Sequence, residues 1–123
     1  MHKKVLILDK KENFMMNSEL KNGIFVCLAV CAADGLISQE EEGSLEADFE
    51  KEFAVDSNDF QKIVEMFFAS GDQLEVFLNS VNDRALRKRL LEIAARAAAT
   101  DGLDISENIA LQKSQAYWSQ SFA

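Results

Sequence analysis

Two short acidic segments in the chain carry the residue types best suited to chemistry. Each has Asp-Gly, then a short turn, then a glutamate six or seven residues after the aspartate. Carboxylate oxygens are the ligands that calcium, magnesium and manganese prefer, whereas zinc more often takes nitrogen and sulfur. If the two copies meet in space, they pool five carboxylates as a candidate divalent-cation site: Asp34, Glu41, Asp101, Asp104 and Glu107.

The same residues also have a purely structural explanation. The glycine of each copy suits the left-handed residue that ends a helix. Ser38 with Glu41 three residues later spells a capping box for the following helix, and Asp104 with Glu107 has the same spacing. None of these roles needs a ligand, so helix capping and cation binding are two open interpretations of one pattern.

Both glutamates are expected to face the protein interior. Glu41 precedes Leu45 and Phe49 by four and eight residues, and Glu107 precedes Leu111 by four. Residues four apart lie on the same face of a helix. Each carboxylate therefore heads an apolar stripe and should point towards the junction between helices.

A calcium loop confined to the first copy is excluded by its own residues. When Asp34 and Gly35 are placed at positions five and six of an EF-hand loop, Glu41 falls at position twelve, as that loop requires. Positions one and three would then be Val30 and Ala32, which have no side-chain oxygen. A cation site therefore needs both copies of the motif.

The elements that must position these carboxylates are helices. The chain of 123 residues contains no proline, and alanine, leucine, glutamate and lysine are frequent, which favours an all-α protein. We predict a compact bundle of about six helices with two pseudo-repeated Asp-Gly helix-turn-helix motifs. Residues 1–17 form an N-terminal arm, and residues 18–123 form a single domain.

Two of the expected helices should be neighbours. The helix that begins near Ser18 is apolar on nearly every face, which indicates a central position. The fifth helix, which follows Asp83, is rich in alanine from Ala94 to Ala99. Small side chains allow helices to approach closely. If the two helices run parallel, their C-terminal ends bring Asp34 and Asp101 together.

The order of these features resembles a known family. The motif from Ala33 to Glu41, Ala-Asp-Gly-Leu-Ile-Ser-Gln-Glu-Glu, is followed some sixty residues later by an alanine-rich helix ending in Asp-Gly. This arrangement resembles the TerB-like domain of tellurite-resistance operons, to which a domain of the DjlA class of membrane-anchored co-chaperones is related, over residues 20–118.

The resemblance implies an all-α domain with an acidic cluster associated with metal binding, and it implies no settled enzymatic activity. Residue by residue, it points to Asp34, Glu41 and Asp101. It extends to Glu107 with one difference, because the second copy is one residue shorter between Asp-Gly and Glu.

Charge and composition exclude several function classes. The formal net charge of −8 disfavours nucleic acid and anionic membranes. The only histidine is His2, and no nucleophile with a base or phosphate-binding loop is evident, so we expect no enzymatic activity. Cys27 and Cys31 share an apolar helix face and are expected to be buried, reduced thiols. No apolar run is long enough for a membrane span or a signal peptide, which predicts a cytoplasmic protein.

Two functional classes fit these observations. The first is a TerB-like, cation-responsive stress-response module that docks other proteins. The second is an acidic inhibitor or immunity-type protein whose glutamate-rich helix after Ser38 covers a basic partner. Cation-dependent stabilisation favours the first class, whereas salt-sensitive binding without a cation response favours the second.

Overall fold

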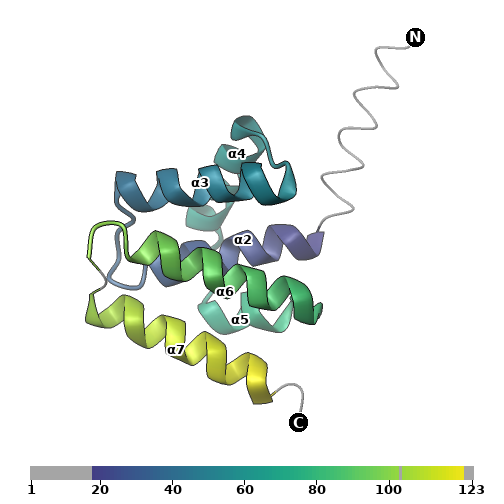
Figure 1. The fold of residues 1–123 in the computed structure, drawn as a ribbon, viewed down its shortest axis with the longest axis vertical. Helices are drawn as coiled ribbons and strands as arrows, with labels where there is room; N and C mark the ends of the chain where they lie inside the picture. Colours follow the sequence, from purple (N-terminus) through teal and green to yellow (C-terminus); the bar gives the residue numbers. More distant parts are fainter. Residues whose placement is uncertain (1–17, 103, 121–123) are drawn as a thin grey trace.

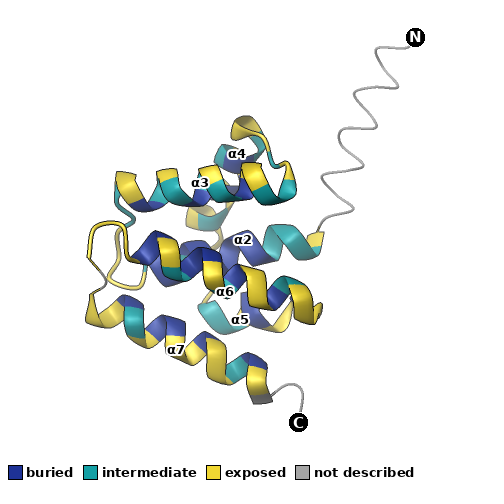
Figure 2. Cartoon of the chain, in the orientation of Figure 1, coloured by how far each residue is buried: buried dark blue, intermediate teal, exposed yellow. Residues whose placement is uncertain are grey.

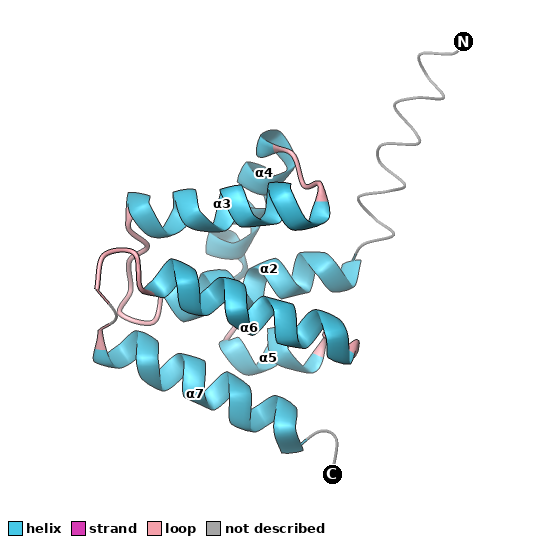
Figure 3. Cartoon of the chain, viewed as in Figure 1, coloured by secondary structure: helices cyan, strands magenta, loops and turns pink. Residues whose placement is uncertain are grey.

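The computed structural model describes residues 18–102 and 104–120, which form six helices and no strand (Figures 1 and 3). The predicted all-α bundle of about six helices is therefore confirmed. The N-terminal arm predicted for residues 1–17 lies outside the described part of the chain. None of the six helices is long and apolar enough to cross a membrane. The helices are α2 (Ser18–Cys31), α3 (Gln39–Phe53), α4 (Ser57–Ser70), α5 (Leu74–Asn79), α6 (Arg84–Ala98) and α7 (Ile105–Gln120).

Helix α2 lies at the centre of the bundle, as its apolar sequence predicts. It contacts every other helix of the described part, and most of its length is buried (Figure 2). Helices α3 and α4 cover one side of the α2 and α6 pair, and α5 and α7 cover the other (Figure 1). An apolar helix on which five others pack gains from burial on all its faces.

Local capping fixes where the helices begin. The side chains of Ser38, Asp56 and Asp83 each accept a hydrogen bond from the backbone N–H three residues further along. These bonds satisfy N–H groups that a helix leaves without a partner in its first turn. The helix starts that the sequence predicts after Ser38 and Asp83 are confirmed.

Helices α2 and α6 are the neighbours that the sequence predicts, and they run in the same direction (Figure 1). One close contact between them involves a residue that the sequence pattern did not single out. A Cβ atom added to Gly23 would lie 2.7 Å from Leu90 Cδ1. One turn further along α2, the Cys27 Sγ donates a hydrogen bond to the Leu90 carbonyl oxygen at 3.4 Å. Glycine thus lets the two helices meet where a larger residue would clash.

Both cysteines are free and fully buried, as predicted. Burial raises the pKa of the Cys27 thiol well above its ordinary value, and the neighbouring Cys31 raises it further. Burial likewise raises the pKa of the Cys31 thiol, with added contributions from the charges of Glu41, Glu107 and Asp101. The thiols therefore stay protonated at neutral pH.

Two basic side chains of α6, those of Arg87 and Arg96, contact neighbouring elements and not solvent alone. Arg87 is buried, and its Nε donates to the Val81 carbonyl oxygen at 2.6 Å, while its guanidinium lies over the Trp118 ring. Arg96 pairs with Asp48 and Glu52 of α3. These contacts link α6 to its neighbours, which sequence spacing along one helix does not reveal.

Candidate functional site

The two Asp-Gly turns meet at one end of the bundle, where α2 and α6 finish and α3 and α7 begin. Together they line a pocket of about 460 Å³, to which all five predicted carboxylates contribute. The parallel packing of α2 on α6 produces this meeting, because it places both helix C-termini at the same end. The pocket is lined by Asp34, Leu36, Ile37, Ser38, Glu41, Asp101, Gly102, Asp104 and Glu107.

The carboxylates form two groups that share one residue. Oxygens of Asp34, Asp104 and Glu107 lie within 4.8 Å of one another, and so do oxygens of Glu41, Asp101 and Glu107. Glu107, which belongs to the second copy, therefore lies near a carboxylate of the first copy in both groups. A divalent cation binds oxygens at about 2.0 to 2.6 Å, so oxygens up to about 5 Å apart can share one ion.

Two of the five side chains are buried and three are exposed. Glu41 has an exposed fraction of 2% and Glu107 of 3%, whereas Asp34, Asp101 and Asp104 lie at the surface. The prediction that both glutamates head buried stripes is confirmed. The two buried glutamates therefore lie inside the site, and the three exposed aspartates form an acidic rim that ions from solvent can reach.

Both glutamates also take part in capping boxes. Ser38 N donates to Glu41 Oε1 at 3.0 Å, and Glu41 N donates to Ser38 Oγ at 3.1 Å. In the second copy, Glu107 N donates to Asp104 Oδ1 at 2.7 Å, and Asp104 N donates to Glu107 Oε1 at 3.4 Å. The structural interpretation of the motif is thus confirmed, but it accounts for one oxygen of each glutamate only.

The second carboxylate oxygen of Glu41 takes no part in the capping box. Glu41 Oε2 is buried, and no donor group of the described residues bonds to it unless the neighbouring Glu107 holds a proton. A buried carboxylate oxygen without a partner is costly, because the group has given up water without receiving a donor or a cation. Capping does not explain why an ionisable group is buried here with one oxygen unsatisfied.

The pKa of the neighbouring Glu107 carboxyl group is shifted in this crowded site. The pKa of Glu107 is raised to about 8, first by burial and then by a hydrogen bond to Glu41 and the charges of Glu41 and Asp104, while the backbone hydrogen bond from Asp104 acts in the opposite direction. A proton held by Glu107 gives Glu41 a hydrogen-bond donor. The pair can thus be satisfied either by a proton or by a cation.

The first turn adds two features that sequence analysis did not assign to the site. Leu36 N donates to Asp34 Oδ1 at 3.1 Å, which orients that carboxylate beside the pocket. Cys31 lies close enough to Glu41, Glu107 and Asp101 for their charges to raise its pKa. The signal for Leu36 was present in the sequence, since a leucine follows the glycine in both copies.

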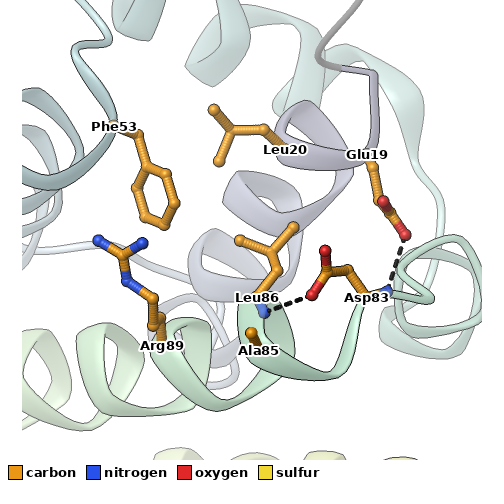
Figure 4. Close-up of a pocket in the computed structure, with 7 residues that line it drawn as sticks. All are labelled: Glu19, Leu20, Phe53, Asp83, Ala85, Leu86 and Arg89. Atoms are coloured by element: carbon orange, nitrogen blue, oxygen red, sulfur yellow. Dashed lines mark hydrogen bonds between the residues drawn. The ribbon is translucent and has the colours of Figure 1, made fainter.

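A second pocket lies at the other end of the α2 and α6 pair (Figure 4). It has a volume of about 330 Å³ and an apolar wall that includes Leu20 and Leu86. Its charged groups are engaged: Asp83 caps α6, Glu19 accepts from the Asp83 backbone N–H, and Arg89 lies over the Phe53 ring and pairs with Glu52. These contacts tie α2, α3 and α6 together, so we assign this pocket a structural role.

The acidic face of α3 is largely used within the fold. Four of the six acidic residues that α3 carries besides Glu41 are half-buried and make contacts: Glu42 and Glu46 accept from Gln61 and Ser57 of α4, and Asp48 and Glu52 pair with arginines of α6. Glu40 and Glu50 are exposed. These contacts leave α3 a smaller acidic surface than its sequence suggests.

Comparisons with protein-family models, curated proteins and solved structures found no match to this chain.

Proposed function

We propose that this protein is a non-enzymatic, TerB-like module that binds a divalent cation between its two Asp-Gly turns and docks other proteins. The observation that carries the cation site is Glu41 Oε2, a buried carboxylate oxygen that lacks a donor whenever Glu107 is ionised, in a pocket lined by four further carboxylates. A divalent cation would satisfy that oxygen and relieve the repulsion among all five groups. The resemblance of the paired motifs to TerB-like domains supports the same assignment.

Helix capping alone does not account for the burial of both glutamates. A capping box needs one carboxylate oxygen at its third position, and a glutamine serves there as well as a glutamate. Burial of two ionisable groups side by side adds nothing to capping and costs stability when both are charged. The burial of both glutamates is therefore better accounted for by a ligand than by helix starts alone.

The donor set favours hard cations. All five ligands offer carboxylate oxygens, which suit calcium, magnesium and manganese. Oxygens no more than 4.8 Å apart can surround one calcium ion, whose oxygen distances of about 2.3 to 2.6 Å place opposite ligands about 4.6 to 5.2 Å apart. The same upper limit admits the shorter oxygen distances of magnesium, so the three ions are tested side by side.

Calorimetric titration and thermal unfolding with calcium, magnesium and manganese test the cation site. A cation that binds only the folded protein raises its melting temperature by mass action. Asp34→Asn with Asp101→Asn should remove both the heat of binding and the thermal shift. The matched control is Glu50→Gln with Glu65→Gln, which removes two exposed charges elsewhere and should keep the cation response. No heat and no thermal shift with any of the three ions at millimolar concentration would rule the site out.

A further inference from the structure

In the part of the chain that the structure describes, the end of the bundle that holds the two turns is strongly acidic. Residues 32–46 and 97–112 contain eight acidic residues and no lysine, arginine or histidine. The basic side chains of α6 that the structure describes pair with α3 or lie nearer the start of the helix, where α2 begins. One divalent cation would neutralise two of these charges, so this end stays negative with or without the ion.

Exposed apolar side chains stand beside this acidic pocket. Leu36 lines it with an exposed fraction of 76%, and Ile105 directly follows the pocket residue Asp104 with an exposed fraction of 77%. Ile109 lies one turn along α7 on the same face and is 59% exposed. Single exposed apolar residues are ordinary, whereas a group of them at one place marks an interaction surface.

Leu36 and Ile105 are neighbours of the same group of carboxylates. The Leu36 backbone N–H binds Asp34, and the Asp34 carboxylate lies within 4.8 Å of those of Asp104 and Glu107. Leu36 from the first turn and Ile105, the residue after Asp104, therefore adjoin one group of carboxylates. We call Leu36, Ile105 and Ile109, with the exposed Asp34, Asp101 and Asp104, the turn surface.

We infer that the turn surface is a docking site for a protein segment that carries lysine or arginine side chains flanked by apolar ones, such as a basic amphipathic helix. Charge complementarity selects this occupant: the basic groups meet the acidic rim, and the apolar groups cover Leu36, Ile105 and Ile109. A second copy of this chain is disfavoured, because two acidic ends would face each other. Nucleic acid and anionic lipid are repelled for the same reason.

This inference rests on the protein-docking part of the proposed function and does not require a bound cation, although both use the carboxylates of Asp34, Asp101 and Asp104. The residues that distinguish the two are separate, since Ile105 and Ile109 do not line the pocket and the carboxylates do. A failure of peptide binding therefore does not contradict the cation site, and a failure of cation binding does not contradict the docking site.

A labelled peptide of about 18 residues, with lysines on one helical face and leucines on the other, is the probe. Its affinity for the full chain is measured by fluorescence anisotropy in EDTA and again with calcium. We expect saturable binding that weakens when salt rises from about 0.05 to 0.5 M. The same peptide with glutamate in place of lysine should not bind.

Paired variants test whether the peptide contacts the turn surface. Ile105→Gln with Ile109→Gln should lower peptide affinity about tenfold and leave calcium titration unchanged. The matched control is Phe68→Gln with Val76→Gln, which removes two other exposed apolar residues on α4 and α5 and should leave peptide affinity within about twofold. Shifts in amide NMR signals should gather on residues 34–41 and 104–110.

Three results would overturn the inference. The first is an absence of saturable binding up to millimolar peptide in both EDTA and calcium. The second is an equal loss of affinity in the two paired variants, which would indicate non-specific apolar contact. The third is self-association of the wild-type chain, seen by sedimentation, that Ile105→Gln with Ile109→Gln abolishes, because a second copy would then be the occupant.

Discussion

Glu41 and Glu107 occupy the same third position in two capping boxes, and their buried carboxyl groups meet across the ends of α2 and α6. They come from turns more than sixty residues apart in the chain. Each carboxyl group gives one oxygen to its own helix start. The meeting of the two groups has consequences for stability that differ from those of two separate caps.

Replacement of Glu41 by glutamine should act in opposite directions with and without a cation. Glutamine keeps a capping oxygen and replaces the unsatisfied Oε2 by a neutral amide. In EDTA, we expect Glu41→Gln to stabilise the protein by about 1 to 3 kcal/mol in urea unfolding, since a buried charge is removed. In calcium, the variant should lose most of the stabilisation that the wild type gains.

Ser38→Ala is the control for this prediction. It removes the cap of α3 without a change in charge, so it should cost about 0.5 to 2 kcal/mol equally in EDTA and in calcium. If the effect of Glu41→Gln on the free energy of unfolding is the same in EDTA and in calcium, as is expected for Ser38→Ala, then Glu41 serves capping alone.

The stability of the cation-free protein should fall as pH rises through neutrality. The pKa of Glu107 is about 8 in the folded protein, above the ordinary value of 4.5. The folded state therefore holds a proton that the unfolded chain releases between these two pH values. The resulting stability is fully present below pH 4.5 and is lost as pH rises through about 8.

Urea unfolding at pH 5, 6, 7, 8 and 9 in EDTA measures this dependence as a difference from Glu107→Gln. The glutamine variant lacks the titrating group, so its free energy of unfolding should fall less than that of the wild type over the range. Glu40→Gln, at an exposed position in the first turn of α3, should follow the wild-type profile. Parallel profiles for wild type and Glu107→Gln would contradict the raised pKa.

Gly23→Ala should destabilise the bundle, because the added methyl group would lie 2.7 Å from Leu90 Cδ1. Overpacking of this kind costs about 1 to 3 kcal/mol. Gly43 provides the comparison within α3, since nothing lies within 4 Å of a Cβ atom added there. Gly43→Ala should stabilise the protein by about 0.5 to 1 kcal/mol through helix propensity. Equal effects of the two alanines in thermal unfolding would mean that α2 and α6 do not meet at Gly23.

The two thiols should be almost unreactive in the folded protein. Cys27 and Cys31 are fully buried, and burial raises the pKa of both. Thiolate is the reactive form, so a thiol reagent at pH 8 should label them only as fast as the protein opens. Full labelling within the mixing time in urea provides the reference. Rapid labelling of either cysteine without urea would show that α2 is not at the centre.

The helix starts were predictable from sequence because the interactions that set them are local. Ser38 with Glu41, Asp104 with Glu107, and the cap at Asp83 each act over three residues, so residue type and spacing are enough. The central position of α2 followed from its apolar faces in the same way. The candidate ligands could be chosen for this reason, since both glutamates head apolar stripes.

The arrangement of those ligands was decided by tertiary packing. No local pattern reveals that Gly23 lets α2 approach Leu90, that Arg96 pairs with α3, or that Leu36 and Ile105 stay exposed beside one pocket. The state of Glu41 Oε2 is decided in the same way, because a missing partner depends on every element that surrounds the atom. A capping hydrogen bond joins residues close in the chain, whereas the pairing of Glu41 with Glu107 exists only after two helices distant in sequence have packed in parallel.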